Sequence, residues 1–155
     1  PNADQLDSDG DGVGDVCDLQ IIEVPFDIKP TSCRNPLGIK GGGVLPAAIL
    51  GTATFDVTQI DLSTVRLAGV APIRFALQDV ATPFYPFIGK TKPFDCTTAG
   101  ADGFNDLTMK FNKDAIINAL GGPALPLGQV LVLKVTGSLL NGTPFIGEDV
   151  VVIIK

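Results

Sequence analysis

The chain has 155 residues, of which 45% are hydrophobic, and this suits one compact domain with a short appendage. Its formal net charge is −6 and it has no basic cluster, so neither a nucleic-acid partner nor an anionic membrane surface is expected. The longest apolar runs, such as residues 150–154, are far shorter than the roughly 20 residues that cross a bilayer, and we expect no membrane insertion.

The first 20 residues are acidic and contain no base, whereas the rest of the chain carries as many acids as bases. Within them, the stretch DSDGDGVGDVCD begins at Asp7 and has the spacing of a twelve-residue EF-hand calcium loop. Acids occupy positions one, three, five, nine and twelve, while Gly12 at position six permits the sharp turn and Val13 at position seven offers its backbone carbonyl. The predicted calcium ligands are Asp7, Asp9, Asp11, Val13, Asp15 and Asp18.

Calcium explains this composition because clustered carboxylates repel one another unless a divalent cation collects their oxygens. The alternative is a solvated acidic linker, which is the usual meaning of a charge run. A linker, however, has no reason to keep glycine at position six and acids at alternate positions. The loop departs from a helical EF-hand in having Asp18 rather than Glu at position twelve and in lacking flanking amphipathic helices. Ca²⁺ is therefore the predicted cofactor, held by an irregular segment.

The sequence between residues 22 and 111 predicts several strands. Residues 22–29 alternate apolar and polar side chains, which predicts a half-buried strand, and Pro25 places it at a sheet edge. A second strand is expected within residues 43–51, and shorter ones around residues 65–67, 73–77 and 107–111.

A second acidic stretch precedes the last of these strands. Asp102, Gly103 and Asp106 have the spacing of positions five, six and nine of a calcium loop, but Thr98 and Gly100 stand where acids are expected at one and three. Asp79 or Asp95 would have to complete such a site through the fold. The favoured interpretation is an Asp-Gly turn before a strand.

The C-terminal part predicts one helix and one hairpin. Residues 112–121 form the helix, with Asn112 as N-cap and Gly121 just past its end. Two β-rich runs within residues 129–155 meet at Asn141-Gly142, which predicts a hairpin with a type I′ turn. Residues 150–154 are apolar throughout, so both faces should be covered. These elements predict an all-β fold, an immunoglobulin-like β-sandwich with one short helix, preceded by the irregular calcium-binding repeat.

Catalytic chemistry is not expected. The chain has no histidine, which removes the commonest general base and the Ser/His and Cys/His nucleophilic pairs. Adjacent Glu148 and Asp149 would point to opposite faces of a strand and are interpreted as rim residues. Three cysteines allow one disulfide by any of three pairings. Sugar-binding modules usually stack sugar rings on exposed Trp or Tyr side chains, and this chain has no Trp and a single Tyr, Tyr85.

The segment PNADQLDSDGDGVGDVCD resembles a thrombospondin type 3 repeat. That resemblance implies calcium binding by an irregular chain and a second ion held by Asn2 and Asp4 with some of the same carboxylates. It divides the chain into a repeat at residues 1–20 and a β-sandwich domain at residues 21–155.

From Phe26 onward the chain resembles a β-sandwich domain of secreted and surface-exposed bacterial proteins, through DIKPTSC, GVLPAAILGTATFDVTQIDLSTVRL, DGFNDLTMKF and GSLLNGTPF. No enzymatic activity is known for that domain, and the resemblance implies an extracellular or cell-surface location. It also implies that Cys33 and Cys96 pair, which leaves Cys17 free or intermolecular.

The expected function is that of an extracellular, calcium-stabilised structural module, a subunit of a surface fibre or filament. Its expected partners are calcium and either further copies of itself or a neighbouring surface protein. An apolar body without net charge and an apolar C-terminal strand that could pair with a neighbour favour self-association. The alternative is a cell-surface or enzyme-appended module that binds a ligand such as a glycan.

Overall fold

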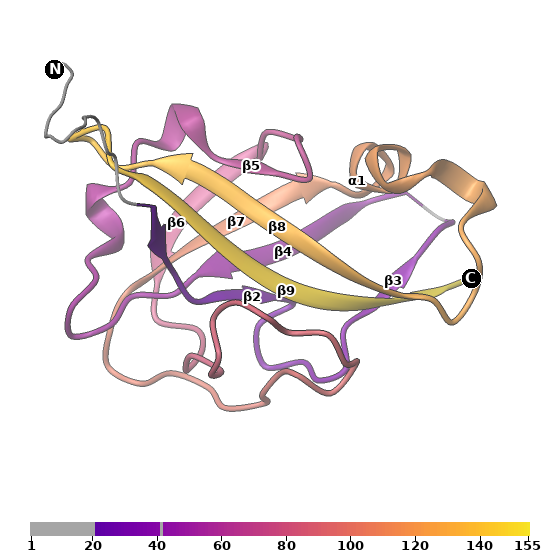
Figure 1. Ribbon diagram of the computed structural model, residues 1–155, viewed down its shortest axis with the longest axis horizontal. Helices are drawn as coiled ribbons and strands as arrows, with labels where there is room; N and C mark the ends of the chain where they lie inside the picture. Colours follow the sequence, from indigo (N-terminus) through magenta and orange to yellow (C-terminus); the bar gives the residue numbers. More distant parts are fainter. Residues whose placement is uncertain (1–20, 41) are drawn as a thin grey trace, which may run out of the picture.

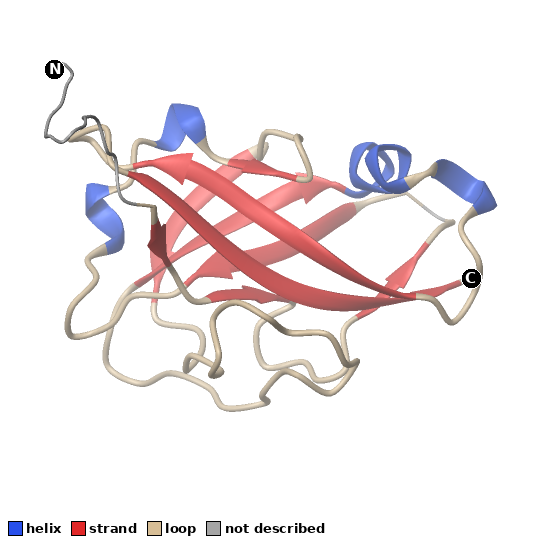
Figure 2. Ribbon diagram, in the orientation of Figure 1, coloured by secondary structure: helices blue, strands red, loops and turns tan. Residues whose placement is uncertain are grey.

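The computed structural model describes residues 21–40 and 42–155, and over these residues the fold is all-β and sandwich-like, with one α-helix (Figures 1 and 2). The predicted repeat at residues 1–20, with its calcium ligands and Cys17, lies outside the described residues. One sheet contains β1 (Ile22–Glu23), β9 (Pro144–Ile154), β8 (Val130–Ser138) and β5 (Arg66–Leu67), with β3 (Pro36–Gly38) also paired to β9. The other contains β2 (Phe26–Ile28), β4 (Val44–Ile49), β7 (Asp106–Asn112) and β6 (Arg74–Gln78).

One hydrophobic core lies between the two sheets. Phe26 from β2, Phe111 from β7 and Phe145 from β9 are its largest fully buried side chains. Three 3-10 turns, η1 (Val57–Gln59), η2 (Leu62–Thr64) and η3 (Gly122–Ala124), and the helix α1 (Lys113–Leu120) complete the described elements. The side chain of Asn112 accepts a hydrogen bond from Ala115 N (3.0 Å) and Gly121 ends the helix at φ 136°, as the sequence predicts.

The predicted first strand is divided between the two sheets at Pro25. β1 pairs in parallel with β9, whereas β2 pairs antiparallel with β4. The two short strands lie at sheet edges, as expected for a segment that contains proline. The prediction of a half-buried strand is wrong for β2, because Asp27 on its polar face is only 6% exposed. The cause is a tertiary contact. The chain around Lys90 packs against β2, and the side-chain amine of Lys90 donates a hydrogen bond to Phe26 O.

The C-terminal hairpin is confirmed, but its predicted turn type is wrong. β8 and β9 pair over their lengths from Val130↔Val152 to Ser138↔Pro144. Of the two residues expected at the turn, only Gly142 has a positive φ (89°), and Gly142 N donates to Leu139 O (2.8 Å). Leu139 N also donates to Thr143 O (2.8 Å). A longer connection of this kind needs one left-handed residue rather than the two of a type I′ turn.

Strands β4, β5, β6 and β7 lie where the sequence predicts them, and β3 was not predicted. The expectation that residues 150–154 are covered on both faces holds except for Ile154, which is 41% exposed. The interpretation of Glu148 and Asp149 as rim residues is wrong, since they are 7% and 1% exposed. The long connection at residues 79–105, which runs beneath the sheets in Figure 1, covers this part of β9, and Gly89 N donates to Glu148 Oε1 (2.8 Å).

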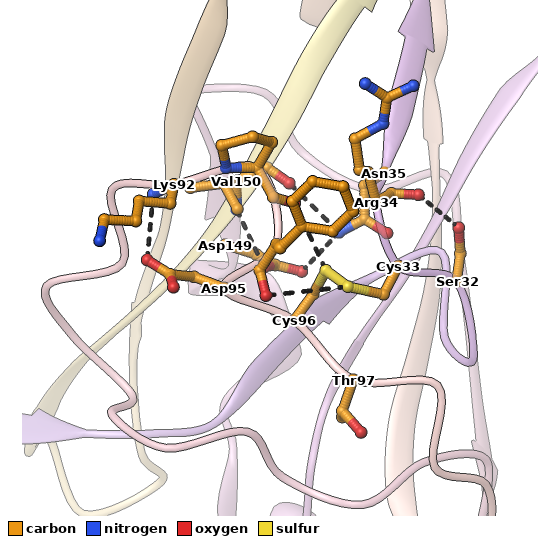
Figure 3. The surroundings of a disulfide bond; sticks show 12 residues. Ser32, Cys33, Arg34, Asn35, Lys92, Asp95, Cys96, Thr97, Asp149 and Val150 are labelled. Carbon is orange, nitrogen blue, oxygen red and sulfur yellow. Dashed lines mark hydrogen bonds between the residues drawn. A yellow bond between two sulfur atoms is a disulfide. The ribbon is translucent and has the colours of Figure 1, made fainter.

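The implied disulfide is present. Cys33, which precedes β3, bonds to Cys96 in the connection 79–105, with 5.4 Å between their Cα atoms (Figure 3). The bond therefore holds that connection against the segment between β2 and β3.

Candidate functional site

An acidic cluster lies where the connection 79–105 starts and ends. Asp79 follows β6, Asp102 lies near the end of the connection, and Asp106 begins β7. One carboxylate oxygen from each of the three residues lies within 4.8 Å of the others. β6 and β7 are adjacent antiparallel strands, and this pairing brings Asp79 next to Asp106. We call these three residues the acidic triad.

Backbone amides shape the triad. Asp79 Oδ1 accepts from Asp102 N (3.1 Å) and its Oδ2 from Gly103 N (2.7 Å), while Asp102 Oδ1 accepts from Phe104 N (3.1 Å). Gly103 has φ 95°, which a glycine adopts readily. The Asp-Gly turn favoured by the sequence is therefore present, and the same turn delivers Asp102 to the cluster.

Asp106 is fully buried and has a structural role of its own. Its Oδ1 accepts from Gly51 N (2.9 Å), and its Oδ2 accepts from Val80 N (2.8 Å) and Ala81 N (3.2 Å). Burial raises the pKa of the Asp106 carboxyl, the three amide donors oppose that rise, and the charge of Asp102 adds to it. A cation beside the triad would relieve the repulsion between these carboxylates.

The triad brings together the two weaker predicted ligands, Asp102 and Asp106, with Asp79, one of the two residues proposed to complete the site. The other, Asp95, lies elsewhere and accepts hydrogen bonds from Thr91 N (2.9 Å) and Lys92 N (3.0 Å). Carboxylate oxygens are the ligands that Ca²⁺ prefers, and backbone carbonyls and water commonly supply the remainder. The donor set thus fits a hard divalent cation, and the identity of that cation stays a prediction.

A shallow hollow of about 550 Å³ adjoins the triad. Tyr85, which is 71% exposed, stacks on Phe87 with 4.8 Å between ring centroids, and both rings line the hollow. Asp102 and Phe104 also line the hollow, with Thr52, Thr54 and Thr82 among the other lining residues. Exposed aromatic rings therefore stand beside hydroxyl groups and a carboxylate.

A second cluster of ionisable groups is buried behind the disulfide. Lys90 Nζ lies 3.4 Å from Asp149 Oδ1, and the two side chains are 3% and 1% exposed. Asn35, fully buried, donates from Nδ2 to Asp149 Oδ2 (3.1 Å) and to Val150 O (3.2 Å), and Figure 3 shows these contacts beside the disulfide. Asp27 is the fourth member, and its Oδ2 is buried without a hydrogen-bond donor. We call these four residues the buried cluster.

The pKa values of the two acids in the buried cluster are raised. Burial and then the charge of Asp149 raise the pKa of Asp27 from 3.8 to about 8, although Lys90 opposes this rise. Burial also raises the pKa of Asp149, against the opposing effects of Lys90 and of the Ile28 and Val150 amides. At neutral pH one of the two carboxyls therefore holds a proton and the other pairs with the Lys90 amine.

Sequence reasoning missed the buried cluster. Its members are far apart in the chain, with a sequence separation of 114 for Asn35 and Asp149 and of 59 for Lys90 and Asp149. The one local signal was Asp149, an acid directly before the apolar run at residues 150–154, whereas Asp27 occupies a polar position of an alternating strand. Such an acid is expected to face solvent unless another segment covers it, and here the connection 79–105 does so.

Comparison with known proteins gives no relationship to argue from: no family model, characterised protein or solved structure matches this chain. None of the helices in residues 21–40 and 42–155 is long and apolar enough to span a membrane.

Proposed function

We propose that the protein is an extracellular, calcium-stabilised structural module rather than an enzyme, and that it serves as a subunit of a surface fibre or filament. The observation that carries this proposal is the acidic triad, in which three carboxylates converge without a basic partner among the contacts that shape them. The disulfide between Cys33 and Cys96 supports an oxidising, extracytoplasmic location.

In this proposal, calcium would hold the connection 79–105 against the sandwich. An ion on Asp79, Asp102 and Asp106 would fix both ends of the connection 79–105 to the start of β7. The predicted loop at Asp7 to Asp18 would be stiffened in the same way, and its resemblance to a thrombospondin type 3 repeat is part of the proposal. We also assign the sandwich to the immunoglobulin-like class, from its strand content and its two facing sheets.

Self-association is supported by the exposed edge of the second sheet. Among the described strands, β6 pairs only with β7, so one side of its backbone is open to another strand. Ile73 beside β6 and Leu77 within it are 55% and 53% exposed. An apolar hollow of about 310 Å³ lies alongside, lined by Val57, Ile60, Leu62, Phe75, Leu77 and Leu107 among others. A strand from a second copy could add to β6 and cover these side chains.

The calcium proposal is tested by isothermal titration of calcium into the chelator-treated chain. We expect binding in the weak extracellular range, about 0.1 to 1 mM. Asp102→Asn should remove the heat that belongs to the triad, and Asp11→Ala the heat that belongs to the N-terminal loop. Asp114→Asn is the matched control, since Asp114 is an exposed acid on α1, and it should titrate as the wild type does. An absence of heat in the wild type would refute the proposal.

The hollow beside Asp102 favours a second candidate function, calcium-assisted binding of glycans. Stacked Tyr85 and Phe87 offer an aromatic face, and an ion on the triad would lie next to it and could bridge to sugar hydroxyls. A glycan array probed with the chain in calcium and in chelator tests this function. Tyr85→Ala should abolish any calcium-dependent signal, and a signal unchanged by Tyr85→Ala would rule out this site.

A further inference from the structure

The buried cluster places an amine against an acyl group in a site that excludes water. Lys90 Nζ donates to Phe26 O (3.1 Å) and lies 3.4 Å from Asp149 Oδ1. The ring of Phe84 lies with its centroid 5.6 Å from Nζ. The oxygen that faces the amine is bonded to the carboxyl carbon of Asp149, so the nucleophile and the electrophile of an amide-forming reaction are already neighbours. The atoms that would react are Nζ and Cγ, and Cγ is one covalent bond from the oxygen that lies 3.4 Å from Nζ. Attack needs the two reacting atoms about 3 to 3.5 Å apart.

The other oxygen of Asp149 is held by two preorganised donors. Asp149 Oδ2 accepts from Ile28 N (2.7 Å) and from Asn35 Nδ2 (3.1 Å). If an amine attacks the carboxyl carbon, negative charge develops on this oxygen. Fixed donors in a buried site stabilise such charge far better than water does, because they need no reorganisation. Ile28 and Asn35 thus supply an oxyanion hole.

Asp27 is placed to transfer the protons that the reaction requires. Asp27 lies between Phe26, whose carbonyl accepts from Lys90, and Ile28, whose amide donates to Asp149, and its Oδ2 receives no hydrogen bond from any described donor. A buried carboxyl oxygen without a donor is satisfied when it carries a proton and donates instead. Burial raises the pKa of Asp27 to about 8, which suits a group that gives and takes protons near neutral pH.

We propose that Lys90 and Asp149 condense to form an intramolecular isopeptide bond between Lys90 Nζ and Asp149 Cγ, with Asp27 as the acid–base residue.

The proposed reaction balances without any oxidant or added reagent. The Lys90 ammonium first passes a proton to the Asp149 carboxylate, which removes two opposite charges from a buried site. The neutral amine attacks Cγ of the Asp149 carboxylic acid, and the Asp27 carboxyl exchanges protons as the tetrahedral intermediate forms. The C–O bond to the leaving hydroxyl breaks as that oxygen takes a second proton. The products are one amide and one water molecule, and Asp27 ends with the proton that it began with.

The bond would complete a second covalent tie to the connection 79–105. The disulfide joins Cys96 in that connection to Cys33, and the isopeptide bond would join Lys90 to the core strand β9. A neutral amide would also replace a buried ion pair, whose desolvation cost offsets much of its attraction. The inference does not depend on calcium binding or on assembly.

Intact-mass spectrometry of the full chain, reduced and unfolded, tests the proposal. The wild type should weigh one water molecule less than its sequence, and a proteolytic digest should contain a branched peptide that joins Lys90 to Asp149. The full sequence mass, in a preparation that melts cooperatively and contains the disulfide before reduction, would overturn the proposal. Loss of ammonia rather than water would also overturn it, because the bond would then involve Asn35.

Three variants separate the bond from other losses of water, such as succinimide formation at Asp-Gly sequences. Lys90→Arg keeps the positive charge but cannot form the amide, and Asp27→Asn keeps the shape but cannot exchange the proton. Both should show the full sequence mass. Lys92→Arg is the matched control, since Lys92 is an exposed lysine of the same connection, and it should still lose one water. A loss of water that persists in Lys90→Arg would contradict the proposal. If a variant fails to fold, the wild-type digest is the test: the branched peptide that joins Lys90 to Asp149 supports the proposal, and its absence contradicts it.

Discussion

At the scale of single residues, the described part of the protein depends on acids that are buried rather than exposed. Asp27, Asp106 and Asp149 are each at most 6% exposed. Two of them are satisfied by backbone amides, Asp106 by three and Asp149 by those of Ile28 and Val150. Asp27 is the exception, because one of its oxygens receives no donor. Burial raises the pKa of all three carboxyls. At Asp106 three amide donors oppose that rise and tie the carboxylate to the backbone, whereas one oxygen of Asp27 has no such donor.

The first prediction concerns pH. The pKa of Asp27 is about 8 in the folded protein, against 3.8 as its ordinary value, so between these values the folded state holds a proton that the unfolded state has lost. The contribution of Asp27 to stability is fully present below pH 3.8 and is lost as the pH rises through about 8. Urea unfolding of the wild type should show this fall relative to Asp27→Asn, which has no proton to lose.

The direction of this effect is the same whether or not Lys90 is bonded to Asp149, because burial is the largest cause of the raised pKa. A stability difference between wild type and Asp27→Asn that stays constant from pH 4 to about 8 would contradict the assignment.

The second prediction separates the structural role of Asp106 from metal binding. Asp106→Ala would leave the amides of Gly51, Val80 and Ala81 buried without an acceptor. Each such group costs about 1 to 3 kcal/mol, so the free energy of unfolding in chelator should fall by about 3 kcal/mol or more. Asp102→Ala, which loses a single local bond to Phe104 N, is the comparison and should cost about 1 kcal/mol or less in chelator. Equal losses in the two variants would show that Asp106 has no such role.

At the scale of elements, local pattern located the strands and the helix but not their environment. The short runs at residues 73–77 and 107–111, bounded by turn residues, and the cap residues Asn112 and Gly121 correctly predicted β6, β7 and α1. β3 was missed because three residues, Pro-Leu-Gly, carry no periodicity. The first strand is divided at Pro25 because its two halves join different sheets. Tertiary packing, and not the local pattern, decides which sheet each half joins. The turn type was wrong because the hairpin loop extends beyond Asn141-Gly142.

The third prediction tests the close crossing of the two sheets at Gly147 in β9. A Cβ there would lie 2.9 Å from Phe26 Cβ, 3.0 Å from Val135 Cγ1 and 3.0 Å from Val24 O. Backbone and core atoms cannot move away easily, so Gly147→Ala should lower the free energy of unfolding by about 1 to 3 kcal/mol. Gly100→Ala adds a Cβ with nothing within 4 Å and should change stability by no more than about 0.5 kcal/mol. Equal chemical-denaturation midpoints for the two variants would contradict the packing described here.

The candidate site was predicted in part, at the same scale. Calcium-loop spacing singled out Asp102 and Asp106, although an Asp-Gly turn was the favoured interpretation, and either Asp79 or Asp95 was named to complete the site. The β6–β7 pairing brings Asp79, and not Asp95, next to them. The buried cluster carries no comparable signal. Lys90 in a loop and Asp27 and Asp149 in two different strands become a cluster only when the connection 79–105 folds over β2 and β9.

At the scale of the whole molecule, the long connection at residues 79–105 is held against the sandwich at several points. The disulfide, the ion pair between Lys90 and Asp149, and the hydrogen bonds from Val80 N and Ala81 N to Asp106 all attach residues 79–105 to the sandwich. The edge strand β6, with exposed Ile73 and Leu77, remains open on one side among the described residues. A module with a reinforced body and an open apolar edge suits assembly end to end, and head-to-tail contacts that do not close produce filaments.

The most direct test of the proposed function is sedimentation velocity of the purified chain in millimolar calcium and again in chelator, with Leu77→Lys as the assembly variant. We expect large species in calcium that dissociate in chelator, and a monomer under both conditions for Leu77→Lys. A single monomeric boundary for the wild type in both solutions would contradict the proposal that the protein is a calcium-dependent fibre subunit.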